Sequence, residues 1–288
     1  MLGLTLDPDF ANNRFVYLFY SPADTSVNRL SPFECDGDSL KRATDKVVLQ
    51  FYSQREICCH TGGSLAFGPG RLLFVSTGDS ATPFGEKSVR DPSHGFSLTD
   101  DRPGHEPYDA RRTSANTNDL RGKILRLHVK TDGTYDIPEG NLFAQGTPNT
   151  KPEIFVMGNR NPYRIAVDQK RGWLYWGEVG PDAGNDSLAT RGPRGYDEIY
   201  QARAICPPYY EGKFFIYDWI RHWIMAVTLS PNGNYEAMER FAPRDSFSAP
   251  IDMELGPNGQ LYVLEYGKAW FAKNADAGLS TIEYRGKR

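Results

Sequence analysis

The sequence predicts an all-β protein, a β-propeller whose blades are small antiparallel sheets. A turn signal followed by an alternating aromatic and aliphatic stretch recurs near residues 6, 67, 167 and 256, as LDPDFANNRFVYLFYS, FGPGRLLFVSTGD, VDQKRGWLYWGEVG and GPNGQLYVLEYG. Helical periodicity is hard to find between these segments. Short hairpins that repeat at intervals of tens of residues are typical of propellers, where a four-stranded blade takes roughly 40 to 50 residues.

Each recurring segment is expected to form a hairpin whose second strand is rich in Tyr, Phe, Val and Trp. Shorter strands are expected in KILRLHV with GTYDI, and in DEIYQAR, KFFIYDW and WIMAVTL. This spacing allows about five or six blades. We therefore expect one propeller domain that covers residues 1–288.

Residues 80–117 interrupt this pattern with a polar, turn-rich segment. Ordinary connections are shorter than about 12 residues, so a loop of this length is usually functional or disordered. Phe84, Phe96 and Tyr108 give the loop apolar side chains that can pack. We expect an ordered loop that covers one face of the domain.

The charge balance excludes two classes of partner. The formal net charge is -3, from 33 basic and 36 acidic residues, and gives no electrostatic reason to expect nucleic acid or an anionic membrane. No segment approaches the roughly 18 uncharged apolar residues of a membrane span, and the N-terminus lacks the pattern of a signal peptide. We expect a soluble globular protein with a substantial core.

Three polar residues directly precede strands that would line the propeller channel. His60 precedes the strand SLAFG, and Arg160 and Asn161 precede a proline in NRNPYRI. An imidazole is a candidate general base because it ordinarily titrates near ~6.5, although a structural histidine is the commoner case. The arginine fork suits a carboxylate or a developing oxyanion, and its alternative role is to stabilise a turn.

Acidic side chains and bare carbonyls gather in GEVGPDAGND and GYDEIY. Hard oxygen ligands on irregular backbone are those that Ca²⁺ prefers, at six to eight per ion. The alternative, equally favoured, is a set of solvated loop acids. The residues concerned are Glu178, Gly180, Pro181, Asp182, Asp186, Asp197 and Glu198.

The four cysteines are too few for a disulfide scaffold and show no CxxC spacing for zinc. Cys58 and Cys59 are adjacent and immediately precede His60. They either stay reduced as small buried side chains, which we slightly favour, or close a vicinal disulfide that stiffens the turn before His60.

Read together and in order, several segments resemble the soluble quinoprotein glucose dehydrogenases, also called glucose/sorbosone or aldose sugar dehydrogenases. The segments are LGLTLDPDFANNRFVYLFYS, HTGGSLAFGPG, STGD, NDLRGKILRL, NRNPYRIAVD, GEVGPD, GYDEI and GPNGQLYVLEYG. The CCHTGG and RPGHEPYDARRTSANTNDLRGK segments look like those of a bacterial subgroup found in larger secreted or periplasmic proteins.

The resemblance implies a six-bladed propeller that binds pyrroloquinoline quinone and Ca²⁺ and oxidises an aldose to its lactone. His60 matches the base that takes the sugar hydroxyl proton while hydride passes to the quinone, and Arg160 and Asn161 match the contacts to the quinone carbonyl edge. An external acceptor such as a cytochrome or a quinone would take the electrons. The matched Ca²⁺ ligands are the carbonyls of Gly180 and Pro181 and, at a second site, Asp197 and Glu198.

Three departures from the family pattern stand out. DWIRHW replaces the family's lysine segment, so Arg221 would stand in for the lysine, and the apolar SAPIDM replaces the paired arginines that hold the cofactor carboxylates. Compared with the family pattern, we expect the opening strand of the first blade and part of a blade near residues 203–207 to be missing, and therefore an incomplete ring of about five blades. Two alternatives follow: a non-catalytic propeller that binds carbohydrate or protein, and a Ca²⁺-dependent lactone hydrolase.

Overall fold

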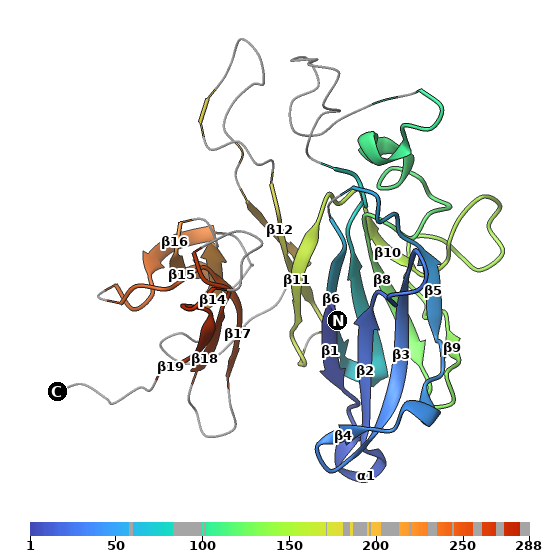
Figure 1. Cartoon of the computed structure of the whole chain (residues 1–288), viewed down its shortest axis with the longest axis horizontal. Coiled ribbons are helices and arrows are strands. Elements are labelled where there is room, and N and C mark those ends of the chain that lie inside the picture. The colour runs from blue at the N-terminus through green and yellow to red at the C-terminus, as the bar shows by residue number, and fades with distance from the viewer. Residues whose placement is uncertain are drawn as a thin grey trace. The chain divides into compact units, whose positions relative to one another are not determined.

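The computed structural model confirms the predicted all-β class, since in the described residues antiparallel strands form five sheets and the helices are short. The chain divides into two units, Met1–Ala202 and Arg203–Arg288. Figure 1 shows the strands of both units. The structure describes residues 1–57, 60–82, 100, 102–170, 172–180, 185–186, 195, 197–202, 213–218, 221–229, 235–243, 245–255, 261–268 and 274–282.

The first sheet of the N-terminal unit has the order β1-β2-β3, and both β4 and β5 pair with β3. A single helical turn, α1, connects β1 to β2, and the backbone leaves it at Arg14 in the left-handed conformation. The elements are β1 (Gly3–Leu6), α1 (Phe10–Asn13), β2 (Phe15–Tyr20), β3 (Val27–Asp36), β4 (Ser39–Leu40), the 3₁₀ turn η1 (Arg42–Thr44) and β5 (Leu49–Tyr52).

The second sheet has the order β10-β8-β7-β6, with β9 paired to β8. The chain that joins β7 to β8 includes the long segment singled out in the sequence, of which residues 83–99 and 101 lie outside the described residues. The elements are β6 (Gly62–Gly68), η2 (Pro69–Arg71), β7 (Leu72–Thr77), η4 (Glu106–Tyr108), η5 (Ala110–Arg112), β8 (Lys123–Val129), β9 (Tyr135–Asp136) and β10 (Ile154–Met157).

The third sheet completes the N-terminal unit with β11 (Pro162–Val167), β12 (Leu174–Glu178) and β13 (Glu198–Ala202). The first strands of the second and third sheets, β6 and β11, pack closely together. Ile165 N of β11 also donates to Ser64 Oγ of β6 at 3.1 Å. The segments that precede these two strands are therefore brought to the same edge of the unit.

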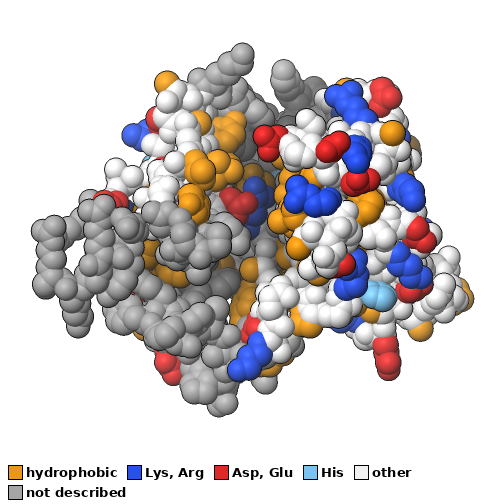
Figure 2. All heavy atoms as spheres, turned by 90° about the horizontal axis from the view of Figure 1, so that it is seen from below, with side chains coloured by type: hydrophobic (Ala, Val, Ile, Leu, Met, Phe, Trp, Pro, Cys, Tyr) orange, Lys and Arg blue, Asp and Glu red, His pale blue; other side chains and the backbone are white. Residues whose placement is uncertain are grey.

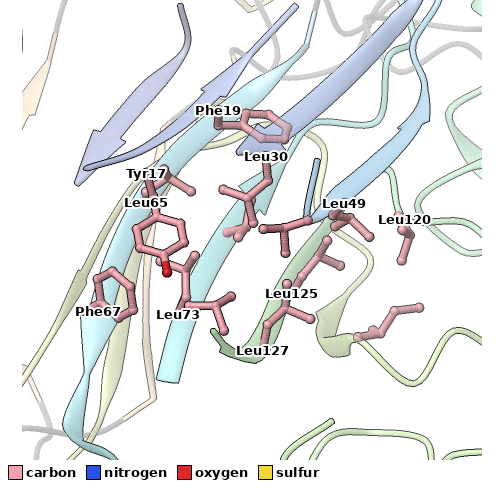
Figure 3. Close-up of a cluster of buried hydrophobic side chains, with 14 residues drawn as sticks. Tyr17, Phe19, Leu30, Leu49, Leu65, Phe67, Leu73, Leu120, Leu125 and Leu127 are labelled. Carbon is pink, nitrogen blue, oxygen red and sulfur yellow. The ribbon is translucent and has the colours of Figure 1, made fainter. Parts of the chain in front are cut away.

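Alternation along the strands builds the core between the first two sheets. Tyr17 and Phe19 of β2 point to one face and are fully buried, because side chains along a strand alternate between its two faces. They pack against Leu65 and Phe67 of β6, with the Tyr17 and Phe67 rings 5.3 Å apart edge to face. Figure 3 shows these side chains, with leucines from β3, β5, β7 and β8, converging on one apolar layer.

The C-terminal unit contains two three-stranded sheets. Its core contains Ile224, Phe241, Phe247 and Val263. The strands are β14 (Lys213–Asp218), β15 (Trp223–Leu229) and β16 (Tyr235–Arg240) in one sheet, and β17 (Pro250–Leu255), β18 (Leu261–Glu265) and β19 (Gly278–Ile282) in the other.

The predicted hairpins are confirmed as β1–β2, β6–β7, β11–β12 and β17–β18. Several features stay predictions: the number of blades, the closure of a ring and the single domain over residues 1–288. The predicted loss of part of a blade near residues 203–207 also stays a prediction, since these residues lie outside the described ones.

In the described part of the chain, no helix has the length and apolar character that a membrane span requires. Acidic and basic side chains are interspersed on the face drawn in Figure 2.

Candidate active site

His60 lies just before β6 and is held by the residues that follow β7. Its backbone is left-handed, with φ 57°, an uncommon conformation for a residue that is not glycine. Its carbonyl accepts from Ser80 N at 3.0 Å. Its side chain is only 6% exposed, and its Nδ1 lies 2.8 Å from Oδ1 of Asp79. The histidine expected at the rim is thus a buried member of an imidazole–carboxylate pair.

Asp79 fixes the imidazole and is itself fixed on several sides. The carboxylate is 1% exposed, and its Oδ1 also accepts from Ala81 N at 2.8 Å. A carboxylate at Nδ1 favours the tautomer that carries its proton on Nδ1, which leaves a lone pair on Nε2. His60 Nε2 is therefore the atom of this pair that can accept a proton.

Arg160 and Asn161, which directly precede β11, lie beside this pair. Asn161 Oδ1 accepts from Gly62 N at 3.0 Å, and the Arg160 carbonyl accepts from Asp79 N at 2.8 Å. Arg160 Nη1 donates to the Val179 carbonyl at 2.9 Å. These contacts bring His60, Arg160 and Asn161 into one site at the edge where β6 and β11 begin.

Gly78 makes this close approach possible. A Cβ atom built on Gly78 would lie 2.2 Å from the His60 carbonyl oxygen and 2.9 Å from Asn161 Oδ1. Real Cβ atoms essentially never approach backbone at such a distance, so the position requires glycine.

We expect Gly78→Ala to destabilise the N-terminal unit by about 2 to 3 kcal/mol, since overpacking against backbone forces it to shift. Gly177→Ala is the matched control, because a Cβ on Gly177 of β12 meets nothing within 4 Å. Urea unfolding of both variants measures the difference. Equal midpoints would show that the Gly78 segment has room to move.

Glu178, at the end of β12, supports Asn161. The side chain is 8% exposed, and its Oε1 accepts a short hydrogen bond from Asn161 N. Burial raises the pKa of Glu178 to about 7, and the nearby negative charge of Asp79 adds to this increase, while backbone hydrogen bonds from Asn161 and Arg160 oppose it. Glu178 is one of the predicted Ca²⁺ ligands, and in the structure its carboxyl group holds the Arg160–Asn161 segment.

The predicted metal ligands are only partly described. Gly180 N donates to Asp197 Oδ1 at 3.0 Å, so these two residues are close together. Glu198 is exposed at the start of β13. Pro181 and Asp182 lie outside the described residues. Within the described part of the chain, no three His, Cys, Asp or Glu side chains form a metal cluster, and the Ca²⁺ sites stay predictions.

Two other predicted features stay predictions. Arg221 belongs to the C-terminal unit, and its Nη1 donates to Asp218 Oδ2 at 2.5 Å. Its guanidinium group is therefore already paired with a carboxylate. Cys58 and Cys59 lie outside the described residues.

Asp79 was not predicted as a site residue. It lies in the STGD segment, directly after β7. Its only sequence signal is its place at the end of a strand that adjoins the His60 strand. The pairing of His60 with Asp79 thus follows from the β6–β7 hairpin and not from a local motif.

The consecutive antiparallel sheets, with polar residues at the edges of neighbouring strands, define a β-propeller-like fold. Residues 1–204 match the family model described as "Glucose / Sorbosone dehydrogenase". The chain belongs to this family.

Relatives and solved structures agree with this assignment. The chain is 28% identical over 195 residues to aldose sugar dehydrogenase YliI of Escherichia coli, covering 65% of this chain and 42% of the relative. It is 25% identical over 203 residues to quinoprotein glucose dehydrogenase B of Acinetobacter calcoaceticus, covering 67% and 38%. Human Hedgehog-interacting protein is 27% identical over 188 residues, covering 59% and 22%. The chain thus spans about two fifths or less of these relatives.

Two solved structures show the same fold. A putative oxidoreductase (glucose dehydrogenase) from Thermus thermophilus superposes with a TM-score of 0.68 at 22% identity, covering 97% of this chain and 82% of that chain. The PQQ-bound aldose sugar dehydrogenase of Streptomyces coelicolor superposes with a TM-score of 0.59 at 20% identity, covering 97% and 79%.

Proposed function

We propose that the protein is a quinone-dependent sugar dehydrogenase that oxidises an aldose to its lactone. The buried His60–Asp79 pair beside Arg160 and Asn161 carries this proposal, in a chain that belongs to the glucose/sorbosone dehydrogenase family. Its relatives include a quinoprotein glucose dehydrogenase and an aldose sugar dehydrogenase. We further propose that it acts in the periplasm or outside the cell and passes electrons to an external acceptor such as a cytochrome or a quinone.

Each residue of the site would have its own role in this reaction. His60 Nε2 would take the proton of the anomeric hydroxyl group, and Asp79 would stabilise the imidazolium that forms. Bound pyrroloquinoline quinone would supply the electrophile that receives the hydride from the sugar carbon. Loss of one proton and one hydride from the aldose balances the formation of the lactone.

The residues present fit one edge of such a cofactor better than the other. Arg160 and Asn161 carry N–H donors beside His60 and would contact the quinone carbonyl edge. The predicted Ca²⁺ would bind at the carbonyls of Gly180 and Pro181. Residues 245–255 include no Lys or Arg, so this strand offers no cation for the cofactor carboxylates. Arg221 stays the predicted stand-in for the family's lysine.

A second candidate function is a non-catalytic module that binds carbohydrate or protein. The absence of basic residues over residues 245–255 favours it, because quinone carboxylates would lack partners there. The similarity to Hedgehog-interacting protein, whose name describes a binding partner, also favours it. The two functions differ in a single measurable property, which is binding of the quinone.

Titration of the purified chain with pyrroloquinoline quinone and Ca²⁺ tests the proposal. We expect saturable binding with a change in the quinone absorbance, followed by reduction of a redox dye when aldoses are added. Omission of Ca²⁺ or of the quinone should each abolish dye reduction. A chain that binds no quinone but is retained on immobilised sugars or a protein partner would support the binding module instead.

A further inference from the structure

Lys123, the first residue of β8, is fully buried, with 0% of its surface exposed. Its ammonium group reaches three backbone carbonyls and donates to Thr113 O at 2.7 Å, Arg121 O at 2.8 Å and Ser114 O at 3.0 Å. These three acceptors match the three N–H bonds of an ammonium group. The arrangement ties the returning end of the long β7–β8 connection to the start of β8.

A buried ammonium group is costly to the fold unless it is compensated. Burial lowers the pKa of Lys123 to about 8, while the negative charge of Asp119 opposes this effect and Arg121 adds to it. Asp119 is itself bound by Arg121, with Nη2 at 2.6 Å from its Oδ2. Among the described residues, the Lys123 ammonium group therefore relies on carbonyl dipoles and not on a direct carboxylate partner.

Thr113 connects Lys123 to the candidate base. Its carbonyl accepts from Lys123 Nζ, while its hydroxyl group donates to the Asp79 carbonyl at 2.8 Å. Asp79 then holds His60 through Nδ1. Four residues are thus linked in series, from an ammonium group to an imidazole.

A second set of contacts fixes the residues just before Asp79. Thr77 Oγ1 accepts from Lys123 N at 3.1 Å, and Gly122 N donates to the Gly78 carbonyl at 2.8 Å. The backbone of residues 77–79 is therefore held by the same segment that the Lys123 side chain closes. Removal of the ammonium group would loosen both sets of contacts.

We propose that Lys123 is a positioning residue for the candidate base: it closes the segment of residues 113–121 and thereby sets, through Thr113, the place of Asp79 and the orientation of His60. This inference rests on the proposed function. A small displacement of a catalytic group costs up to about 100-fold in rate, so loss of this clamp has a measurable effect on turnover.

Thr113→Val tests the link with the least disturbance, because it removes the hydroxyl group and keeps the carbonyl that Lys123 binds. We expect kcat to fall about 10-fold with little change in KM, and Thr113→Ser, which keeps the hydroxyl group, to restore it. Lys123→Met should lower kcat by about 100-fold. Lys130→Met is the control. Lys130 directly follows β8, its side chain is half exposed, and its Nζ lies 2.9 Å from Asp136 Oδ2.

A second readout is independent of dehydrogenase activity. Nitrogen NMR of the His60 imidazole, recorded without sugar or quinone, reports whether the proton stays on Nδ1. We expect a single Nδ1–H tautomer in the unmutated chain and in Thr113→Ser, and a mixture in Thr113→Val and Lys123→Met. Unchanged His60 tautomers in folded Thr113→Val would overturn the proposal, whether or not the chain oxidises sugars. A tautomer shift without any activity in the unmutated chain would overturn the proposed function alone.

Discussion

His60→Gln is expected to lower turnover by ~10²- to 10⁴-fold, the usual cost of losing a general base. Glutamine has a similar reach and can donate to Asp79, but its amide cannot take a proton from a sugar hydroxyl group. Quinone affinity should change little, because the cofactor contacts are assigned to Arg160 and Asn161. Steady-state dye reduction with an aldose, together with a quinone titration, measures both effects.

The stability of the His60→Gln variant separates a rate effect from unfolding. His60 is buried against Asp79, so we expect a loss of about 1 to 2 kcal/mol in the free energy of unfolding. That loss leaves the chain folded under assay conditions. His128→Gln is the matched control, because the His128 side chain is 41% exposed and lies 3.8 Å from Asp136. Normal turnover by His60→Gln would place the base elsewhere.

The fold was predictable because its signal is local. Successive side chains of FVYLFY point to opposite faces of the strand. Tyr17 and Phe19 enter the core between the first two sheets, and Val16 and Leu18 are buried on the other face beside Phe33. The hairpins followed from such alternation and from the turns between strands. No local sequence pattern indicates how many sheets close into a ring, because ring closure depends on contacts between distant segments.

Sequence patterns indicated some residues of the candidate site but not others. His60 and Asn161 stood out because each directly precedes a strand, although the contact from Gly62 N to Asn161 Oδ1 joins residues 99 apart in the chain. No sequence pattern distinguishes Asp79 from other acidic residues that follow a strand. The β6–β7 hairpin places its carboxylate against the His60 imidazole. No sequence pattern indicates the burial of Lys123, because two of the carbonyls that bind its ammonium group, those of Thr113 and Ser114, come from the long connection before β8. Glu178 was counted among the possible Ca²⁺ ligands, and only the pairing of β11 with β12 places its carboxyl group against Asn161 N.

The second large effect is expected at the turn between β6 and β7, the opposite end of β6 from His60. Arg71 Nη1 and Nη2 donate to the two carboxylate oxygens of Asp7 at 2.9 and 2.7 Å, and this pair ties the first sheet to the second. The Asp7 side chain is fully buried. It also accepts from Asp9 N and Asn13 Nδ2, each at 2.9 Å.

Arg71→Met is expected to destabilise the N-terminal unit by about 2 to 4 kcal/mol at neutral pH, because breaking a buried pair leaves a charge without its partner. The expected cost is below the upper end for buried pairs, since the Arg71 side chain is 34% exposed. Urea unfolding at neutral pH measures it. Arg29→Met is the control, because Arg29 on β3 donates to the neutral Gln50 and not to an acid.

The pH dependence of this loss follows from the Asp7 carboxylate. Burial alone would raise its pKa, but the hydrogen bonds from Arg71, Asp9 and Asn13 outweigh burial and lower the pKa from the ordinary value of 3.8. A lowered pKa contributes stability above that ordinary value, and this contribution is lost as the pH falls through the folded-state pKa. In Arg71→Met the main opposing contact is gone, so Asp7 should take up a proton at a higher pH than in the unmutated chain. Protonation removes the unpaired charge, and the difference between the two proteins should therefore shrink in acid.

An Asp7→Asn and Arg71→Met double variant should recover part of the lost stability at neutral pH. If Arg71→Met unfolds at the same urea concentration as the unmutated chain at neutral pH, the pair does not hold the two sheets together.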